Sequence, residues 1–219
     1  MRSRYRQSVN DECKVLTTPA DEAASGRTVV RLYLATLPSV LRAVAVHHWF
    51  VVQDLETGQL DRWEVWQRRD AGGESWGHVH RNLMRPDRPV GGGPPAVAAE
   101  WRGEEALGLR VLLERPESYP FRNCYRYWPG PNSNTYAAWH LSRAGLLHDF
   151  DPRGVGKDFL GSHGFGLERG PGGVCVGSPL LGLRAGPAAG VEFHLLSLTF
   201  GVSLRPFAIK TPLGSIRRR

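Results

Sequence analysis

The residues best suited to chemistry lie in one short stretch, WPGPNSNTYAAWHL, at residues 128–141. Pro129 and Pro131 bar a helix before this point, and Asn132 or Ser133 is a good N-cap for the helix that follows. A side chain at a helix N-terminus lies where unpaired N–H groups and the helix dipole favour negative charge. The stretch therefore predicts either a plain capped core helix, or a helix N-terminus that presents Ser133 as a nucleophile beside oxyanion-binding N–H groups.

A histidine that precedes this stretch supplies a possible general base. His47 lies in the strand-like segment HHWFVV. Papain-like enzymes place a nucleophile at a helix N-terminus facing a histidine on an adjacent strand, and in their circularly permuted relatives the histidine strand comes first. The order of His47 and Ser133 resembles the permuted arrangement. Serine stands where those enzymes have cysteine, so Ser133 needs His47 as a true base, and the alternative is a pseudo-active site that only binds.

The cysteines offer one rival nucleophile and indicate the compartment. Cys124 lies in FRNCYRYW, which we expect to be a strand before the turn, and its alternative role is that of a small buried apolar side chain. The three cysteines are widely spaced and contain no Cys-x-x-Cys pair, which argues against a disulfide framework and a structural zinc site. No signal peptide is recognisable at the N-terminus, so we expect a cytoplasmic protein.

Other polar motifs do not complete a metal or cofactor site. His78 and His80 share one side of an expected strand but lack a third ligand at a recognisable spacing. Lys157 and Asp158 follow a glycine-rich segment, but the hydroxyl residue of a phosphate-binding loop is missing, so they are expected to form an ion pair or to line the pocket. We expect no metal and no cofactor. His140 and His148 are expected at the surface, and His194 in the core.

The elements that must position these residues are strands, then helices, then strands. We expect strands at 27–35 and 78–84, and a hairpin over 43–67 with its turn at Glu-Thr-Gly, in which His47 and His48 point to opposite faces. Residues 99–120 are expected to form an amphipathic helix stopped by Pro116, and 133–147 a second helix. The glycine-dense segment 151–190 should be extended with turns, and 191–204 a single strand.

This order indicates one α+β domain, an antiparallel sheet packed with the central motif-bearing helix, in which a permuted papain-like arrangement is one possibility. We expect a flexible polar tail over 1–26, the domain over 27–214 and a basic tail over 215–219.

The charge and hydropathy patterns bear on partners. The formal net charge is +7, but much of the excess lies at the two ends of the chain and there is no basic helix between them. We therefore regard nucleic acid as an improbable partner. The most apolar region is interrupted by charged residues and a proline, so it lacks the roughly 20 apolar residues that a membrane span requires.

The motifs also resemble a specific family. The blocks HHWFVV, YPFRNCYRYWPGPNSNTYAAWHL and GVGKDFLG, together with the segment 190–214, are similar to the bacterial domain-of-unknown-function 3750 family, over residues 28 to about 214. The family has no established activity, so the resemblance implies no reaction. The positions that match its motifs are His47, Trp49, Trp128, Asn132, Ser133, Asn134, Thr135, Lys157 and Asp158.

Three functions follow from the sequence. The first is an amide or ester hydrolase, or an acyl transferase, with Ser133 attacking and His47 as base in a papain-like cleft. The second is a non-catalytic module that binds a small molecule, peptide, glycan or lipid group in the same cleft. The third is association with an anionic surface or nucleic acid through the basic ends.

Overall fold

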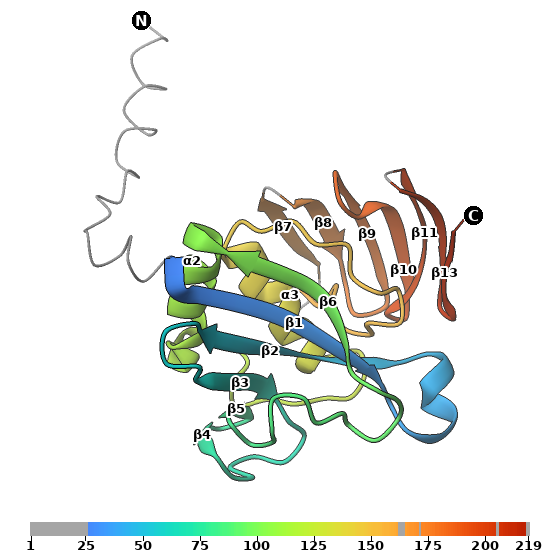
Figure 1. Ribbon diagram of the computed structural model, residues 1–219. Coiled ribbons are helices and arrows are strands. Elements are labelled where there is room, and N and C mark those ends of the chain that lie inside the picture. Colours follow the sequence, from blue (N-terminus) through green and yellow to red (C-terminus); the bar gives the residue numbers. More distant parts are fainter. Residues whose placement is uncertain (1–25, 162–164, 171, 205, 218–219) are drawn as a thin grey trace, which may run out of the picture.

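A computed structural model describes residues 26–161, 165–170, 172–204 and 206–217 (Figure 1). The expected N-terminal tail lies, apart from Gly26, outside the described residues, as do Arg218 and Arg219. Two antiparallel sheets and two α-helices make a mixed α+β fold, which confirms the expected class.

The first sheet has six strands in the order β4-β5-β3-β2-β1-β6. Their bounds are β1 Thr28–Thr36, β2 Val46–Asp54, β3 Leu60–Val65, β4 Glu74–Trp76, β5 Val79–Arg81 and β6 Ala96–Arg102. The expected strand at 27–35 and the hairpin are confirmed. The Asp54 carboxylate accepts the N–H groups of Glu56 and Thr57, which fixes the hairpin turn. The strand expected at 78–84 is shorter, because it is only β5.

Two α-helices follow, α2 at Gly103–Leu113 and α3 at Ser133–Arg143, and two short 3-10 helices occur at Ser39–Ala43 and Pro116–Ser118. The helix expected from residue 99 was wrong at its start. Residues 96–102 pair with the free edge of β1 as β6, and Gly103, at φ 64°, turns the chain into α2. The boundary between β6 and α2 therefore depends on the free edge of β1, which exists only in the folded sheet.

The alternation along β2 divides its side chains between two environments. Phe50 and Val52 face the helices and pack with Tyr136 and Leu141 in the main core, whereas Trp49 and Val51 pack on the opposite face of the sheet. His140 was expected at the surface, but it is fully buried in α3 beside Tyr136 and Tyr119. The helical spacing of Tyr136 and His140 puts both on the core-facing side, and the Nδ1–H of His140 donates to the Tyr136 carbonyl at 2.9 Å.

The second sheet is a seven-stranded meander, and it lies beside α3 and apart from the first sheet (Figure 1). Its strands are β7 Gly166–Gly170, β8 Gly173–Gly177, β9 Leu181–Gly186, β10 Gly190–Leu195, β11 Leu198–Leu204, β12 Phe207–Thr211 and β13 Gly214–Arg217. The single strand expected at 191–204 was wrong. Leu196 and Ser197, at φ 53° and 57°, form a tight turn that folds this segment into the hairpin β10–β11.

In the described part of the chain, neither α-helix has the length and apolar content needed to cross a bilayer.

Candidate functional site

The motif Asn132–Thr135 forms a complete capping box at the start of α3. The Oδ1 of Asn132 accepts the N–H groups of Asn134 and Thr135 at 2.9 and 3.2 Å, and the N–H of Asn132 donates to Oγ1 of Thr135. The Trp128–Pro129 and Gly130–Pro131 peptide bonds that lead into it are both cis. Asn132, one of the two expected caps, is therefore the N-cap, and the capping box that it forms with Thr135 occupies three of the four N–H groups that the helix end offers.

Asn134 ties this helix end to β2. Its Nδ2 donates to the carbonyls of Val46 and Val155 at 3.0 and 2.8 Å, and its Oδ1 accepts the Nδ1–H of His48 at 2.7 Å. His48 is fully buried, and burial lowers its pKa to about 4 in spite of the Asn134 bond. The histidine that faces the motif helix is thus His48, a position that the sequence motifs did not single out.

Thr135 ties the start of α3 to Gly156, the first residue of the Gly-Lys-Asp motif at residues 156–158. The Thr135 hydroxyl donates to the Gly156 carbonyl at 2.7 Å. Gly156 has φ 87°, and a Cβ there would lie 2.7 Å from Asn132 Nδ2 and 2.9 Å from the Pro129 carbonyl. Only glycine allows this approach, because both the dihedral and the space exclude a side chain. The side chains of Asn132, Asn134 and Thr135 are therefore used in hydrogen bonds that hold the fold together. Ser133 is the residue of this motif whose side chain makes no such bond among the described residues.

A cavity of about 680 Å³ opens at the end of the first sheet where β2 begins. Its wall is mostly apolar, and parts of it come from the 3-10 helix at Ser39–Ala43, the segment before α3 and the first residue of β11. The apolar lining residues are Leu37, Pro38, Leu41, Val44, Ala45, Val46, Trp66, Val90, Tyr125, Tyr127, Trp128, Val155 and Leu198. The polar side chains on the wall are His47, Gln67, Asn132, Ser133 and Asn134. The cavity thus joins the two residues that the sequence proposed as a pair, His47 and Ser133.

His47 belongs to a buried ionic relay on the sheet face opposite α3. Its Nε2 lies 3.2 Å from Oε2 of Glu64, and the same oxygen accepts from Nη2 of Arg62 at 2.8 Å. Arg62 also donates to the carbonyls of Arg85 and Arg88. Burial raises the pKa of the Glu64 carboxyl, but the bonds from His47 and the charge of Arg62 outweigh it, so the pKa lies below its usual value.

This relay fixes which nitrogen of His47 is available. The Nε2–H points to Glu64, and Nδ1 has no hydrogen-bond partner among the described residues. With the proton of the ring on Nε2, Nδ1 is the nitrogen that can accept a hydrogen bond from a group in the cavity. Glu64 and Arg62 are the site residues that the sequence reading missed. Their alternation with Trp63 and Val65 in β3 was the available signal, since it puts both charges on one face with His47 and Trp49.

Ser133 is 4% exposed and lines the cavity at the first position of α3. Its hydroxyl has no partner in the part of the chain that the structure describes, and no hydrogen bond joins it to His47 there. Because the Asn132 side chain caps the N–H groups of Asn134 and Thr135, the N–H of Ser133 itself is the helix-end donor left for a ligand oxygen.

The other candidate residues lie around this cavity or away from it. Cys124 was expected on a strand or buried, but it follows a turn and is exposed. Trp49 shares the sheet face of His47 but does not line the cavity; it stacks on Tyr33 and lies under the guanidinium of Arg62. Trp128 lines the cavity, and its Nε1–H donates to the Leu196 carbonyl of the second sheet at 2.7 Å.

Lys157 and Asp158 belong to a separate buried cluster between the motif segment and the second sheet. Lys157 Nζ bonds Thr199 and lies 3.7 Å from Glu192, whose other oxygen accepts from Lys210 at 2.6 Å. Asp158 lies 3.6 Å from His194. Burial raises the pKa of Glu192, but Lys157 and Lys210 more than offset it and hold the pKa far below the usual value. These motif residues attach the second sheet and do not line the larger cavity.

Among the described residues, no group of three or more histidine, cysteine, aspartate or glutamate side chains is placed to hold a metal ion.

Together, the fold and site define an α+β protein with an apolar cavity at a capped helix N-terminus. The chain belongs to a family described as protein of unknown function (DUF3750), whose model matches residues 27–159. The match confirms the resemblance seen in the motifs. It ends before β7, so the second sheet lies outside it, although the motif resemblance was expected to extend to residue 214. No curated protein and no solved structure is significantly similar to this chain.

Proposed function

We propose that this protein binds a small molecule with an extended apolar group in the cavity at the start of α3. The observation that carries the proposal is the cavity itself, whose volume of about 680 Å³ is that of a ligand site and whose polar side chains gather around the motif. The capping box and the Asn134 bonds hold the motif rigid, which lowers the entropy lost when a ligand binds.

The wall favours one of the ligand classes that the sequence left open. A glycan needs many polar partners, but most lining side chains are aliphatic or aromatic. A fatty acyl or similar chain fits this wall, with its oxygen-bearing end near the Ser133 N–H and hydroxyl and near His47. A ligand of this class would release ordered water from the apolar wall, which supplies the main driving force.

Binding is tested with decanoate and dodecanoate by calorimetry, with maltose as the polar comparison. Leu41→Trp places a large ring on the cavity wall and should reduce affinity at least tenfold. Val40→Trp is its matched control, because Val40 is the preceding residue of the same 3-10 helix, is 86% exposed and does not line the cavity. Equal binding by both variants, or no fatty-acid binding by the wild-type chain, contradicts the proposal.

A second function, hydrolysis of an ester or amide, is favoured because Ser133 Oγ and His47 Nδ1 have no hydrogen-bond partner among the described residues and both residues line the cavity. Ser133 Oγ would attack an ester or amide carbonyl while its proton passes to Nδ1 of His47, and Glu64 would stabilise the resulting imidazolium. His47 would then give that proton to the leaving alcohol or amine, and water would hydrolyse the acyl-serine. The Ser133 N–H would donate to the oxyanion.

This reaction is tested with an alkyl fluorophosphonate and with p-nitrophenyl decanoate. Labelling and turnover should be lost in Ser133→Ala and reduced at least a hundredfold in His47→Gln, while Ser118→Ala, an exposed serine away from the cavity, should match the wild type. A chain that binds decanoate but is neither labelled nor active is a binding module only. The same labelling in Ser133→Ala would assign the nucleophile to another residue.

The environment that we propose is a reducing one, the cytoplasm. The two described cysteines, Cys124 and Cys175, are free, which supports it.

A further inference from the structure

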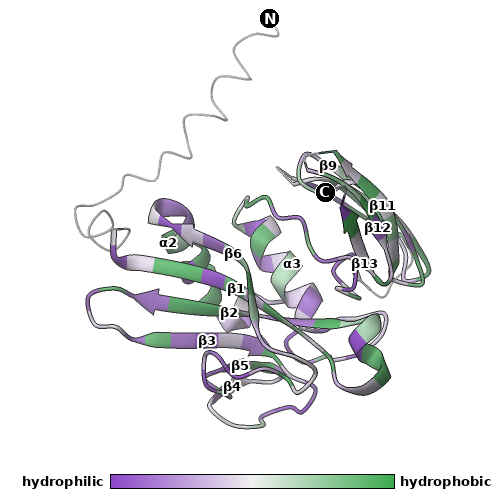
Figure 2. Ribbon diagram, turned by 45° about the vertical axis from the view of Figure 1, so that its right-hand side comes forward, coloured by the Kyte–Doolittle hydropathy of each residue, from purple (hydrophilic) through white to green (hydrophobic). Residues whose placement is uncertain are grey.

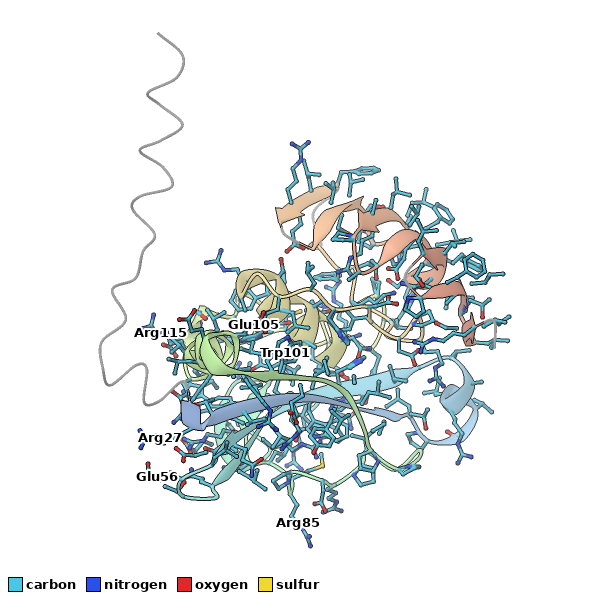
Figure 3. The ribbon with its side chains drawn as sticks, turned by 45° about the horizontal axis from the view of Figure 1, so that its top comes forward. Arg27, Glu56, Arg85, Trp101, Glu105 and Arg115 are labelled. Carbon is cyan, nitrogen blue, oxygen red and sulfur yellow. The ribbon has the colours of Figure 1, made fainter. Side chains whose placement is uncertain are left out.

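The second sheet turns an apolar face outward. Exposed and buried positions alternate along much of β8, β10 and β12. Figure 3 shows side chains of this sheet that project away from the rest of the molecule, and Figure 2 shows hydrophobic segments along its strands. We call this surface the outer face, and its exposed apolar residues are Leu167, Val174, Leu181, Leu183, Val191, Phe193, Leu195, Phe200, Val202, Leu204, Phe207, Ile209 and Ile216.

These residues are contiguous across the strands. Val191, Val202, Ile209 and Ile216 are successive partners in the register of β10 to β13, and Phe193 lies opposite both Leu183 and Phe200. Seven strands at about 4.8 Å spacing make a face about 29 Å wide. An apolar area of that size is uncommon on a protein that water alone surrounds.

The inner face of the same sheet has the opposite character. Glu192, His194, Thr199 and Lys210 point towards the rest of the protein and are fully or almost fully buried. An antiparallel sheet that covers a water-facing core normally buries its apolar side and exposes its polar side. Here the charged side is buried and held by ion pairs with Lys157 and Asp149. The rest of the described chain therefore packs on the polar side of this sheet, and the apolar outer face is left exposed.

The charges around the outer face have one sign. On the edge strand β7, Arg169 pairs with Val174 and shares the outer side, whereas Arg217 of β13 pairs with the buried Ala208 and lies on the inner side. The acidic residues of these strands point inward, because Glu192 is buried among the lysines and Glu168 bonds Ser142 of α3. The whole chain carries a formal net charge of +7. An anionic surface attracts a chain of this charge, whereas a second copy carries the same charge and is repelled.

We propose that the outer face of the second sheet docks on an anionic lipid bilayer, with Phe193 and Phe200 at its centre inserted among the acyl chains and Arg169 of the edge strand β7 at the headgroups. This peripheral attachment is independent of the cavity. Because the outer face lies on the far side of the sheet from α3, a protein docked in this way keeps the rest of the chain in water.

The test is co-sedimentation of the full chain with vesicles of phosphatidylcholine alone or with 30% phosphatidylglycerol, a composition chosen for its negative charge. The expected result is binding to the anionic vesicles and at least tenfold weaker binding to the neutral ones. Phe193→Asp/Phe200→Asp should weaken binding to anionic vesicles at least tenfold. Val40→Asp/Leu55→Asp is the matched control, since both residues are exposed apolar side chains outside the second sheet.

A wild-type measurement keeps the test decisive if the aspartate variant does not fold. Photoactivatable phosphatidylglycerol should cross-link peptides from residues 181–209 and spare β3 to β6. Absent vesicle binding, equal binding to neutral vesicles, or cross-links confined to the first sheet overturns the proposal. A wild-type dimer in sedimentation velocity that Phe193→Asp/Phe200→Asp converts to a monomer overturns it too, because a second copy then covers the outer face.

Discussion

The Nδ1–H of His48 donates to Oδ1 of Asn134 at 2.7 Å, across 86 positions of sequence, and both side chains are buried. This bond joins the second strand of the sheet to the first turn of the motif helix. Asn134 also bonds Val46 and Val155 through its Nδ2, so one side chain holds β2, α3 and the segment before the Gly-Lys-Asp motif. The position of Ser133 beside the cavity depends on this junction.

Asn134→Ala should lower the free energy of unfolding by about 3 kcal/mol, because buried His48 and the Val46 carbonyl lose their bonds to Asn134, while the Val155 carbonyl keeps only its bond from Asn132. Ser133→Ala is the neighbouring control and should change stability by less than about 1 kcal/mol, since the serine hydroxyl has no partner among the described residues. Urea denaturation measures both. Equal losses in the two variants would show that Asn134 does not carry the junction.

Stability should fall as the pH drops from 6.5 towards 4. Burial lowers the pKa of His48 and His140 to about 4 and that of His148 to about 3. The unfolded chain therefore binds protons below pH 6.5 that the folded chain excludes, and each histidine can remove about 3 kcal/mol by pH 4. Below pH 4.5, protonation of Glu64 and Glu192, whose pKa values are lowered by folding, adds to the loss.

This pH dependence is checked by urea denaturation at pH 7.5, 6, 5 and 4.5. His140→Phe keeps an aromatic ring in the core but cannot bind a proton, so its stability should fall less steeply over this range than that of the wild type. Identical slopes would remove His140 from the explanation.

Glu64→Gln should destabilise the protein by about 3 to 5 kcal/mol, because it leaves the Arg62 guanidinium buried beside a neutral amide. The same variant should reduce any esterase activity, since His47 loses the carboxylate that holds its Nε2–H. Glu56→Gln is the exposed counterpart. It breaks only the surface pair with Arg27, which Figure 3 places at the hairpin turn, and should change stability by less than about 1 kcal/mol. Comparable effects at both sites would argue against a buried relay.

Lys157→Met should loosen the second sheet before the first, because Glu192 then keeps only one of its two lysines. Hydrogen exchange is the measurement: amides of β10 and β11 should exchange at least tenfold faster, while those of β1 and β2 keep their protection. The matched variant Arg110→Met breaks only the partly exposed pairs that Arg110 makes with Asp54 at the end of β2 and with Glu114, and should leave the protection of both sheets unchanged. Faster exchange throughout the molecule in Lys157→Met would mean that the two sheets unfold as one unit.

Local patterns in the sequence predicted the first hairpin and the motif helix. The turn residues between β2 and β3 and the Pro-Gly-Pro segment before Asn132 are signals that neighbouring residues suffice to produce. The sequence also indicated the opposite faces of His47 and His48, because strand alternation needs no knowledge of the rest of the fold. It misplaced the start of α2 and joined β10 to β11, since pairing partners and two residues at positive φ decided those boundaries.

The motif types, the family and the capped helix end were thus determined by the sequence alone, since each depends on residues within one turn or one strand. Only the tertiary structure decided what the motif residues do. Asn134 meets His48, Glu64 orients His47 and Lys157 meets Glu192 through pairings between distant segments, and no spacing along the chain encodes such distances. The tertiary structure also decided that the second sheet buries its polar face and exposes its apolar face. An alternating strand has two faces, and only packing selects the one that is buried.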